Sequence, residues 1–234
     1  MLSIIGLGLD DGEITQKGLE AVKSSEKVFV EFYTNTETVD ISELEEKTGR
    51  TIEKLSRKEV EQEDKILETA EKSDTAFLVS GDPITATTHY DIKTRAEERE
   101  IDVKVIHAPS ILTSVAETGL NVYKFGRVVT LPADSNPDSI GDMIEKNLSV
   151  GLHTLVLFDI DLRAEKALEK LGKIKSDLKD GKAVVCERMN ADDQEITYGE
   201  YEDLVEEDYG ETPHCIVIPG DLSHKEEEFV EQHG

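Results

Sequence analysis

The sequence predicts an α/β protein with a mainly parallel sheet in its N-terminal half and a mixed sheet in its C-terminal half. Short apolar runs alternate with longer segments whose apolar residues recur every three or four positions. The first pattern is typical of buried strands and the second of amphipathic helices. After Gly119 the strand-like and helical segments indicate a second α/β unit with more mixed strand directions. We therefore expect an N-terminal domain of residues 1–109 and a C-terminal domain of residues 110–234, each with helices flanking its sheet.

The N-terminal half begins with a strand that runs into a glycine-containing turn. Residues 2–9 form this strand, and Thr15 is placed to cap a helix over residues 16–24. A second strand is expected over residues 27–33. Residues 34–72 are polar, with sparse apolar residues at helical spacing, so we expect helices packed on the outside of the sheet.

The next stretch joins a strand to a helix through a tight polar turn. The run Ala76-Phe-Leu-Val79 indicates a buried parallel strand, and Ser80-Gly-Asp-Pro83 indicates the turn. Pro83 is expected at the first position of the following helix. In a parallel sheet such a turn lies at the carboxyl edge, where ligands bind. An ordinary connection between a strand and a helix would use the same residues, and the two interpretations stay open at this point.

The remaining elements follow the same patterns. A strand with its turn covers residues 103–110, and Ile111 opens a helix. In the second half we expect strands over residues 127–131, 153–159, 181–188 and 214–218, a hairpin partner over 194–198, helices over 137–148, 165–178 and 201–207, and an acidic helix at the end.

Charge and composition restrict the classes of function. The formal net charge of −26 argues against nucleic acid and anionic membranes as partners. This acidity fits either a high-salt cytoplasm, which screens charge repulsion, or steering of a basic protein partner. No apolar stretch approaches the length of a membrane span. Cys186 and Cys215 lie in strand-like runs, so we expect buried thiols in a reducing cytoplasm, with no disulfide and no metal site.

The first turn resembles a dinucleotide-binding fingerprint only in part. Gly6, Gly8 and Gly12 do not have its spacing, and Asp10-Asp11 would repel a pyrophosphate. A ligand without phosphates suits this turn better.

Three segments in sequence order indicate a family. They are Ile5-Gly-Leu-Gly-Leu9 with Ile14-Thr-Gln-Lys-Gly-Leu19, then Ser80-Gly-Asp-Pro83, then His107-Ala-Pro-Ser-Ile111. This order resembles the two-domain tetrapyrrole-methylase-like fold of methyltransferases that use S-adenosylmethionine. Within that superfamily the chain resembles the diphthine synthases, in Glu31-Phe-Tyr33, Gly81 to His89, Gly119 to Gly126, Gly151 to Thr154 and Pro213 to Gly220.

The resemblance implies an enzyme that modifies a protein. Its substrate would be translation elongation factor 2, whose aminocarboxypropyl-modified histidine would receive methyl groups, three of them in archaea, on its amine. The product is diphthine, an intermediate of diphthamide biosynthesis. The methyl donor would be S-adenosylmethionine, which leaves as S-adenosylhomocysteine, with no metal. The family also implies a cytoplasmic homodimer and a cofactor cleft between the two domains.

The same resemblance identifies cofactor-binding positions. Those in the first domain are Leu9, Asp82, Thr85, Ser110 and Ile111. Those in the second domain are Phe158, Met189 and His214. Phe158 and Met189 stand where the family often has smaller aliphatic residues.

Methyl transfer from a sulfonium needs mainly alignment and exclusion of water, because the donor is already activated. The attacking amine must first lose a proton. For Asp82 we favour cofactor positioning over base catalysis, although it can also cap the following helix. His89 fits a functional role or a packed core role. His107 and His153 are expected to be structural, and Glu226-Glu-Glu228 an exposed helix face.

Two other functions are alternatives to the diphthine interpretation. The first is methyl transfer to a tetrapyrrole such as a corrinoid precursor. Thr85-Ala-Thr-Thr-His89 argues against it, because those relatives usually have a glycine-rich motif there. The second is a module that binds the cofactor without turnover. The intact Gly81-Asp82 and Pro109-Ser110 argue against that interpretation.

Overall fold

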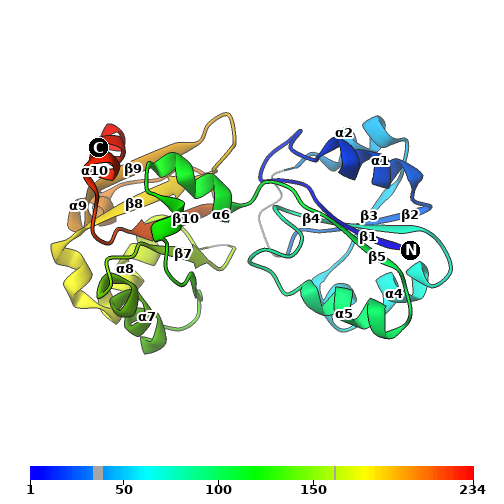
Figure 1. Ribbon diagram of the computed structural model, residues 1–234, viewed down its shortest axis with the longest axis horizontal. Helices are drawn as coiled ribbons and strands as arrows, with labels where there is room; N and C mark the ends of the chain where they lie inside the picture. The colour runs from blue at the N-terminus through cyan, green and yellow to red at the C-terminus, as the bar shows by residue number, and fades with distance from the viewer. Residues whose placement is uncertain (34–38, 161) are drawn as a thin grey trace. The chain divides into compact units, whose positions relative to one another are not determined.

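The computed structural model describes residues 1–33, 39–160 and 162–234 (Figure 1). It divides into two compact units, Met1–Leu112 and Thr113–Gly234, and each unit has its own sheet. The predicted α/β class is confirmed, with a parallel first sheet and a mixed second sheet.

The first unit is built on a sheet of five parallel strands in the order β3-β2-β4-β1-β5. The central strand β4 pairs with β1 so that Phe77 lies opposite Ile4. Both neighbours of β1 are in register with it along its length. The strands are β1 (Leu2–Gly6), β2 (Lys27–Glu31), β3 (Ile52–Lys54), β4 (Thr75–Val79) and β5 (Val103–Ile106).

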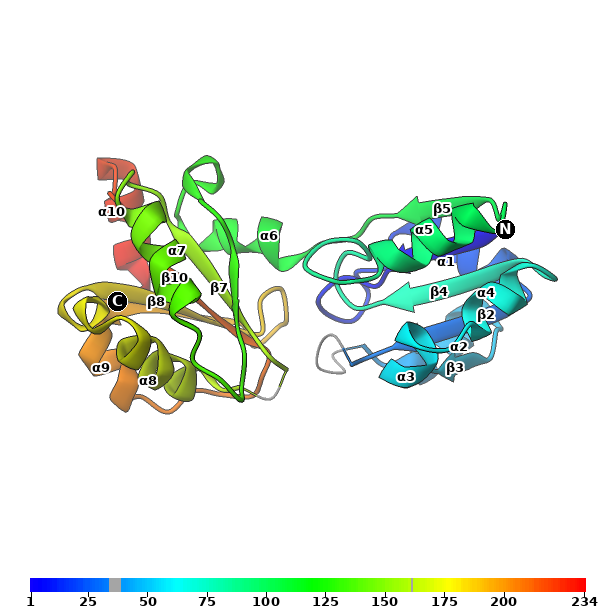
Figure 2. The same ribbon diagram turned by 90° about the horizontal axis from the view of Figure 1, so that it is seen from below.

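Helices cover both faces of this sheet (Figures 1 and 2). On one face, α1 (Gln16–Ser24) and α2 (Ile41–Thr48) pack against apolar side chains such as Ile5 and Leu78. On the other, α3 (Arg57–Glu61), α4 (Lys65–Ala70) and α5 (Tyr90–Glu98) pack against side chains such as Ile4 and Phe77. Adjacent residues of one strand thus enter opposite cores, which explains why the strands are apolar without alternation.

The chain leaves two neighbouring strands in opposite directions. From β1 it crosses through α1, on one face, to β2 on one side of the sheet. From β4 it crosses through α5, on the other face, to β5 on the opposite side. The carboxyl ends of β1 and β4 therefore mark a topological switch point. In open α/β sheets ligands bind at such a point.

Two predictions for the first unit are wrong in detail. Residues 52–54 form the edge strand β3, whereas the sequence pattern predicts only helices over residues 34–72. The sequence hides this strand because only Ile52 of its three residues is buried. The part of that expectation that falls on residues 34–38 lies outside the described residues.

The second difference concerns the start of α5, which begins at Tyr90 and not at Pro83. The Asp82 carboxylate accepts the backbone N–H groups of Ile84 and Thr85 and closes a turn there. Ala86 then takes a positive φ of 56°, which interrupts any helix started at Pro83.

The second unit carries a mixed sheet in the order β6-β7-β10-β8-β9. Only β6 and β7 run parallel, and the other neighbours are antiparallel. On one face, α7, α8 and α9 share a core with residues such as Val156 and Ile216. The strands are β6 (Val129–Leu131), β7 (Thr154–Phe158), β8 (Lys182–Glu187), β9 (Glu195–Glu200) and β10 (His214–Ile218). The helices are α6 (Ile111–Ser114), which begins in the first unit, α7 (Asp138–Leu148), α8 (Ala164–Ile174), α9 (Tyr201–Glu206) and α10 (His224–Val230).

The last helix, α10, is fastened by a buried carboxylate. Glu226 is 3 % exposed, so the prediction that residues 226–228 form one exposed face is wrong for this residue. Its oxygens accept the His153 Nε2–H at 2.9 Å, the Lys124 ammonium at 2.6 Å and the Asn121 backbone N–H at 3.0 Å. His153 Nδ1 in turn accepts the Gly220 backbone N–H at 2.9 Å, which places the imidazole hydrogen on Nε2. The structural role expected for His153 is confirmed.

The two cysteines face each other across strands β8 and β10. Cys186 and Cys215 are opposite residues in the antiparallel register, and both thiols are buried, as predicted. None of the helices in the described part of the chain combines the length and apolar character needed to span a bilayer.

Candidate functional site

Three loops meet at the switch point of the first sheet. The loop after β1 and the loop after β4 exchange backbone hydrogen bonds, since Gly8 N–H donates to Gly81 O at 3.2 Å and Gly81 N–H donates to Gly8 O at 2.6 Å. Gly6 lies where all three loops approach. A Cβ at this position would lie 2.5 Å from Gly81 O, 2.7 Å from Ala108 Cβ and 2.9 Å from Pro83 Cδ. Only glycine permits this approach.

Replacing Gly6 with alanine should therefore destabilise the first unit. The added methyl group would push against the Gly81 carbonyl, and overpacking of this kind costs about 1–3 kcal/mol. Thermal unfolding measures the loss. Gly181→Ala is the matched control, because its Cβ would meet only Leu178 O at 3.5 Å. Equal melting temperatures for the two variants would contradict the tight contact of the three loops.

The Asp82 carboxylate takes part in several hydrogen bonds at this edge of the sheet. Its Oδ1 accepts the Thr85 hydroxyl at 2.8 Å and the backbone N–H groups of Ile84 and Thr85, both at 3.1 Å. Its Oδ2 lies 2.7 Å from Nδ1 of His107, the first residue after β5. Burial alone would raise the pKa of Asp82, but these hydrogen bonds and the neighbouring His107 outweigh it and lower the pKa below its usual range. The site therefore holds a fixed carboxylate.

The structure brings most of the sequence-predicted residues of the first unit to this edge. Leu9 lies beside the turn after β4, with its Cδ2 3.6 Å from the position of a Cβ on Gly81. Thr85 is bonded to Asp82. Ser110 is buried and Ile111 half-buried where the loop after β5 leads into α6. That these residues bind a cofactor stays a prediction.

Two residues at this edge were not found from the sequence. His107, expected to be structural, is a hydrogen-bond partner of Asp82, although its side chain is 72 % exposed. Glu13 accepts the backbone N–H groups of Leu9 at 2.5 Å and Asp10 at 3.2 Å and so shapes the first turn. The position of His107 in the sequence could have identified it, because it directly follows a predicted parallel strand and therefore lies at the carboxyl edge of the sheet.

The three predicted residues of the second unit lie toward the same end of its sheet. Phe158 ends β7, and His214 begins the antiparallel neighbour β10. His214 pairs with Glu187, two residues before Met189. Both ring nitrogens of His214 are used by the protein, because Nδ1 accepts the Ala164 N–H at 3.2 Å and Nε2 donates to Glu211 O at 2.9 Å. Any ligand contact of His214 must therefore use its backbone or the face of its ring.

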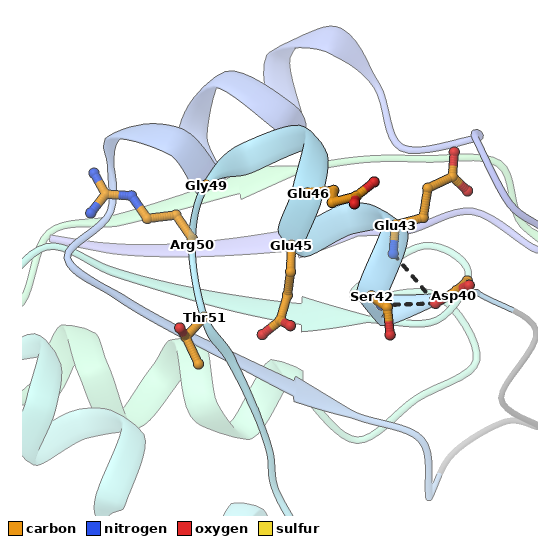
Figure 3. A pocket seen from close by; sticks show the side chains of 8 residues that line it. All are labelled: Asp40, Ser42, Glu43, Glu45, Glu46, Gly49, Arg50 and Thr51. Atoms are coloured by element: carbon orange, nitrogen blue, oxygen red, sulfur yellow. Dashed lines mark hydrogen bonds between the residues drawn. The ribbon is translucent and has the colours of Figure 1, made fainter.

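A hollow elsewhere in the first unit is a weaker candidate (Figure 3). It lies along α2 and the chain that follows, and its polar side chains already serve the fold. Asp40 caps α2, Glu45 accepts the Ile52 N–H at 2.6 Å, and Arg50 binds Lys23 O. The lining residues are Asp40, Ser42, Glu43, Glu45, Glu46, Gly49, Arg50 and Thr51. Within the described ranges no group of three or more His, Cys, Asp or Glu residues is arranged to hold a metal ion.

Comparison with known proteins identifies the family. The family model of tetrapyrrole (corrin/porphyrin) methylases matches residues 1–205. The diphthine synthase of Methanocaldococcus jannaschii is 40% identical, over 98% of this chain and 97% of that protein. The diphthine methyl ester synthase of Schizosaccharomyces pombe is 37% identical, over 98% and 93%. A crystal structure of diphthine synthase superposes with a TM-score of 0.95 at 32% identity, over 100% of this chain and 95% of that one. The chain therefore belongs to the tetrapyrrole methylases and, within that family, to the diphthine synthases, which makes it a methyltransferase.

Proposed function

We propose that this protein transfers methyl groups from S-adenosylmethionine to the amine of the aminocarboxypropyl-modified histidine of translation elongation factor 2, giving diphthine. The observation that carries the proposal is the Asp82 cluster at the switch point, in a chain that matches diphthine synthases along nearly its full length. Transfer of three methyl groups to one amine is proposed on the resemblance of the sequence to archaeal enzymes.

The residues at the switch point fit S-adenosylmethionine. The cofactor carries an ammonium group, for which the fixed Asp82 carboxylate is a suitable partner. It carries no phosphate, which agrees with the acidic Asp10 and Asp11 in the first turn. A Cβ on Gly81 would meet only Leu9 within 4 Å, so the backbone of this turn is open to a close contact. When bound, the cofactor supplies an electrophilic methyl group.

The chain's own contribution is placement and charge. Thr85 and His107 fix the Asp82 carboxylate from two sides, so it needs no reorganisation when a cation binds. For the second unit we propose that Phe158, Met189 and His214 also contact the cofactor. The support is their position toward the same end of the sheet. Homodimeric assembly and a cytoplasmic location are proposed on the resemblance alone, and light scattering would measure the first.

The test is the intact mass of archaeal elongation factor 2 that carries the aminocarboxypropyl histidine, after incubation with this protein and S-adenosylmethionine. We expect a mass increase of up to three methyl groups. Unmodified elongation factor 2 is the control and should gain none. Absorbance with a corrinoid precursor is recorded in parallel. No mass increase with a competent substrate, together with an absorbance change of the corrinoid, would overturn the assignment.

A further inference from the structure

A second polar cluster lies beside the Asp82 cluster, and the proposed function gives it no role. Glu31 ends β2 and pairs in register with Val79, the last residue of the neighbouring β4. His89 lies at the end of the connection that Asp82 begins, immediately before α5. Their side chains are 0 % and 1 % exposed, whereas Tyr33, two residues after β2, is half-buried. The cluster therefore belongs to the same carboxyl edge of the sheet.

His89 is held on both ring nitrogens. Thr87 Oγ1 lies 2.8 Å from Nδ1, and the Tyr33 hydroxyl oxygen lies 3.2 Å from Nε2. Glu31 Oε1 is also close to Nε2, at 3.6 Å. The ring packs perpendicular to that of Phe77, with 5.3 Å between ring centroids. The imidazole has one orientation only.

The surroundings of His89 also determine its charge and which ring nitrogen carries the hydrogen. Burial lowers its pKa to about 4, so the ring is neutral near pH 7 and carries one hydrogen. Glu31 accepts the backbone N–H of Tyr33 at 2.9 Å, as a carboxylate does, and it faces Nε2 with its other oxygen. This arrangement favours the hydrogen on Nε2. The Thr87 hydroxyl then donates to Nδ1, and the Tyr33 oxygen accepts from Nε2–H.

Among the residues that the structure describes, this arrangement provides no acceptor for the hydrogen of the Tyr33 hydroxyl. Within the described ranges, His89 is the one hydrogen-bond partner of that hydroxyl. Burial raises the pKa of Tyr33 above its usual value, and the carboxylate of Glu31 raises it further, so the group stays a phenol. The Arg57 guanidinium lies over the ring, 5.7 Å from its centroid. Tyr33 is therefore a fixed, neutral donor at the ligand-binding edge.

We propose that the Tyr33 hydroxyl donates a hydrogen bond to the carboxylate of the substrate's aminocarboxypropyl group and so orients the neighbouring amine toward the methyl donor. His89 is the positioning residue that fixes Tyr33. The inference rests on the proposed function and adds a specificity-determining residue to it. The carboxylate is the matching group because the amine must keep its lone pair for attack on the methyl carbon, whereas a carboxylate accepts without loss.

Tyr33→Phe tests the inference by steady-state kinetics with modified elongation factor 2 at saturating S-adenosylmethionine. Loss of one hydrogen bond to a charged group should lower kcat/KM roughly 10- to 100-fold. The cofactor Kd from calorimetry should not change, whereas the melting temperature should fall modestly, because the buried His89 ring loses its hydrogen bond to Tyr33. Tyr90→Phe is the matched control, since this neighbouring tyrosine is 58 % exposed and should keep full activity.

His89→Gln separates positioning from a merely structural role. Alone it should lower kcat/KM, but in the Tyr33→Phe background it should have an effect of about twofold or less, because the residue acts through Tyr33. Additive losses would overturn the positioning role. A Tyr33→Phe enzyme with full activity, or with cofactor affinity reduced as much as kcat/KM, would overturn the proposed contact. A wild-type protein that adds no methyl group would overturn the proposed function as well.

Discussion

Asp82→Ala is expected to reduce kcat/KM for methyl transfer by roughly 100-fold or more and to weaken S-adenosylmethionine binding in parallel. The substitution removes the carboxylate that we propose as the partner of the cofactor's ammonium group. It also removes the acceptor for the Thr85 hydroxyl and for the Ile84 and Thr85 N–H groups, and the partner of His107. The turn between β4 and α5 then loses the contacts that fix it. Intact-mass kinetics and calorimetry measure both effects.

Two variants give this experiment its controls. Glu227→Ala removes an exposed carboxylate from α10 and should leave activity unchanged. Asp82→Asn keeps a carbonyl acceptor for Thr85 but removes the negative charge, so it should preserve stability better than Asp82→Ala while still weakening cofactor binding. If Asp82→Ala bound the cofactor as tightly as wild type, the switch-point site would be wrong.

Glu226→Gln should cause the largest loss of stability, about 3–5 kcal/mol, because it breaks a buried ionic network from one side. The Lys124 ammonium would lose its ionic partner. Both carboxylate oxygens of Glu226 accept hydrogen bonds, from His153 and Asn121 on one and from Ser223 on the other, whereas a glutamine has only one oxygen that accepts. Equilibrium unfolding in urea measures the loss. Glu227→Gln, on the same helix and exposed, should cost little. Equal stability of the two variants would show that Glu226 does not fasten α10.

The contribution of Glu226 should depend on pH with a definite sign. Burial alone would raise the pKa of its carboxyl, but hydrogen bonds from Lys124, Ser223 and His153 hold it well below the usual range. The unfolded chain, with a glutamate pKa of about 4.3, therefore binds this proton more readily than the folded protein. The stabilisation is complete above that pKa and is lost as the pH falls below it. The stability difference between wild type and Glu226→Gln should accordingly shrink below about pH 4.

The sequence predicts the strands of both sheets well because their apolar runs are long enough to stand out. It misses β3, whose one buried residue, Ile52, looks like part of a helical pattern. It also places the start of α5 too early. Pro83 suits a first helical position, but the side chain of Asp82 and the positive φ of Ala86 determine the backbone there. The spacing of apolar residues, from which the helix is predicted, does not reveal such local hydrogen bonds.

Sequence position predicts which residues of the candidate site lie at the carboxyl edge of the sheet. Asp82 and His107 each follow a parallel strand closely, which places them at the carboxyl edge. Their contact requires the strand order, since β1 lies between β4 and β5. Glu226 shows the same limit, because its partner Lys124 is 102 residues away and the acidic run around it resembles a solvated face. Long-range ionic pairs leave no local signal.

The most direct test of the central claim is to locate the transferred methyl groups. Modified elongation factor 2 is incubated with this protein and S-adenosylmethionine that carries a deuterated methyl group, and the peptide with the modified histidine is fragmented in a mass spectrometer. The proposed function predicts that every deuterated methyl group lies on the amine of the aminocarboxypropyl chain. Label on any other residue of the factor, or only on the carboxylate as an ester, would contradict it.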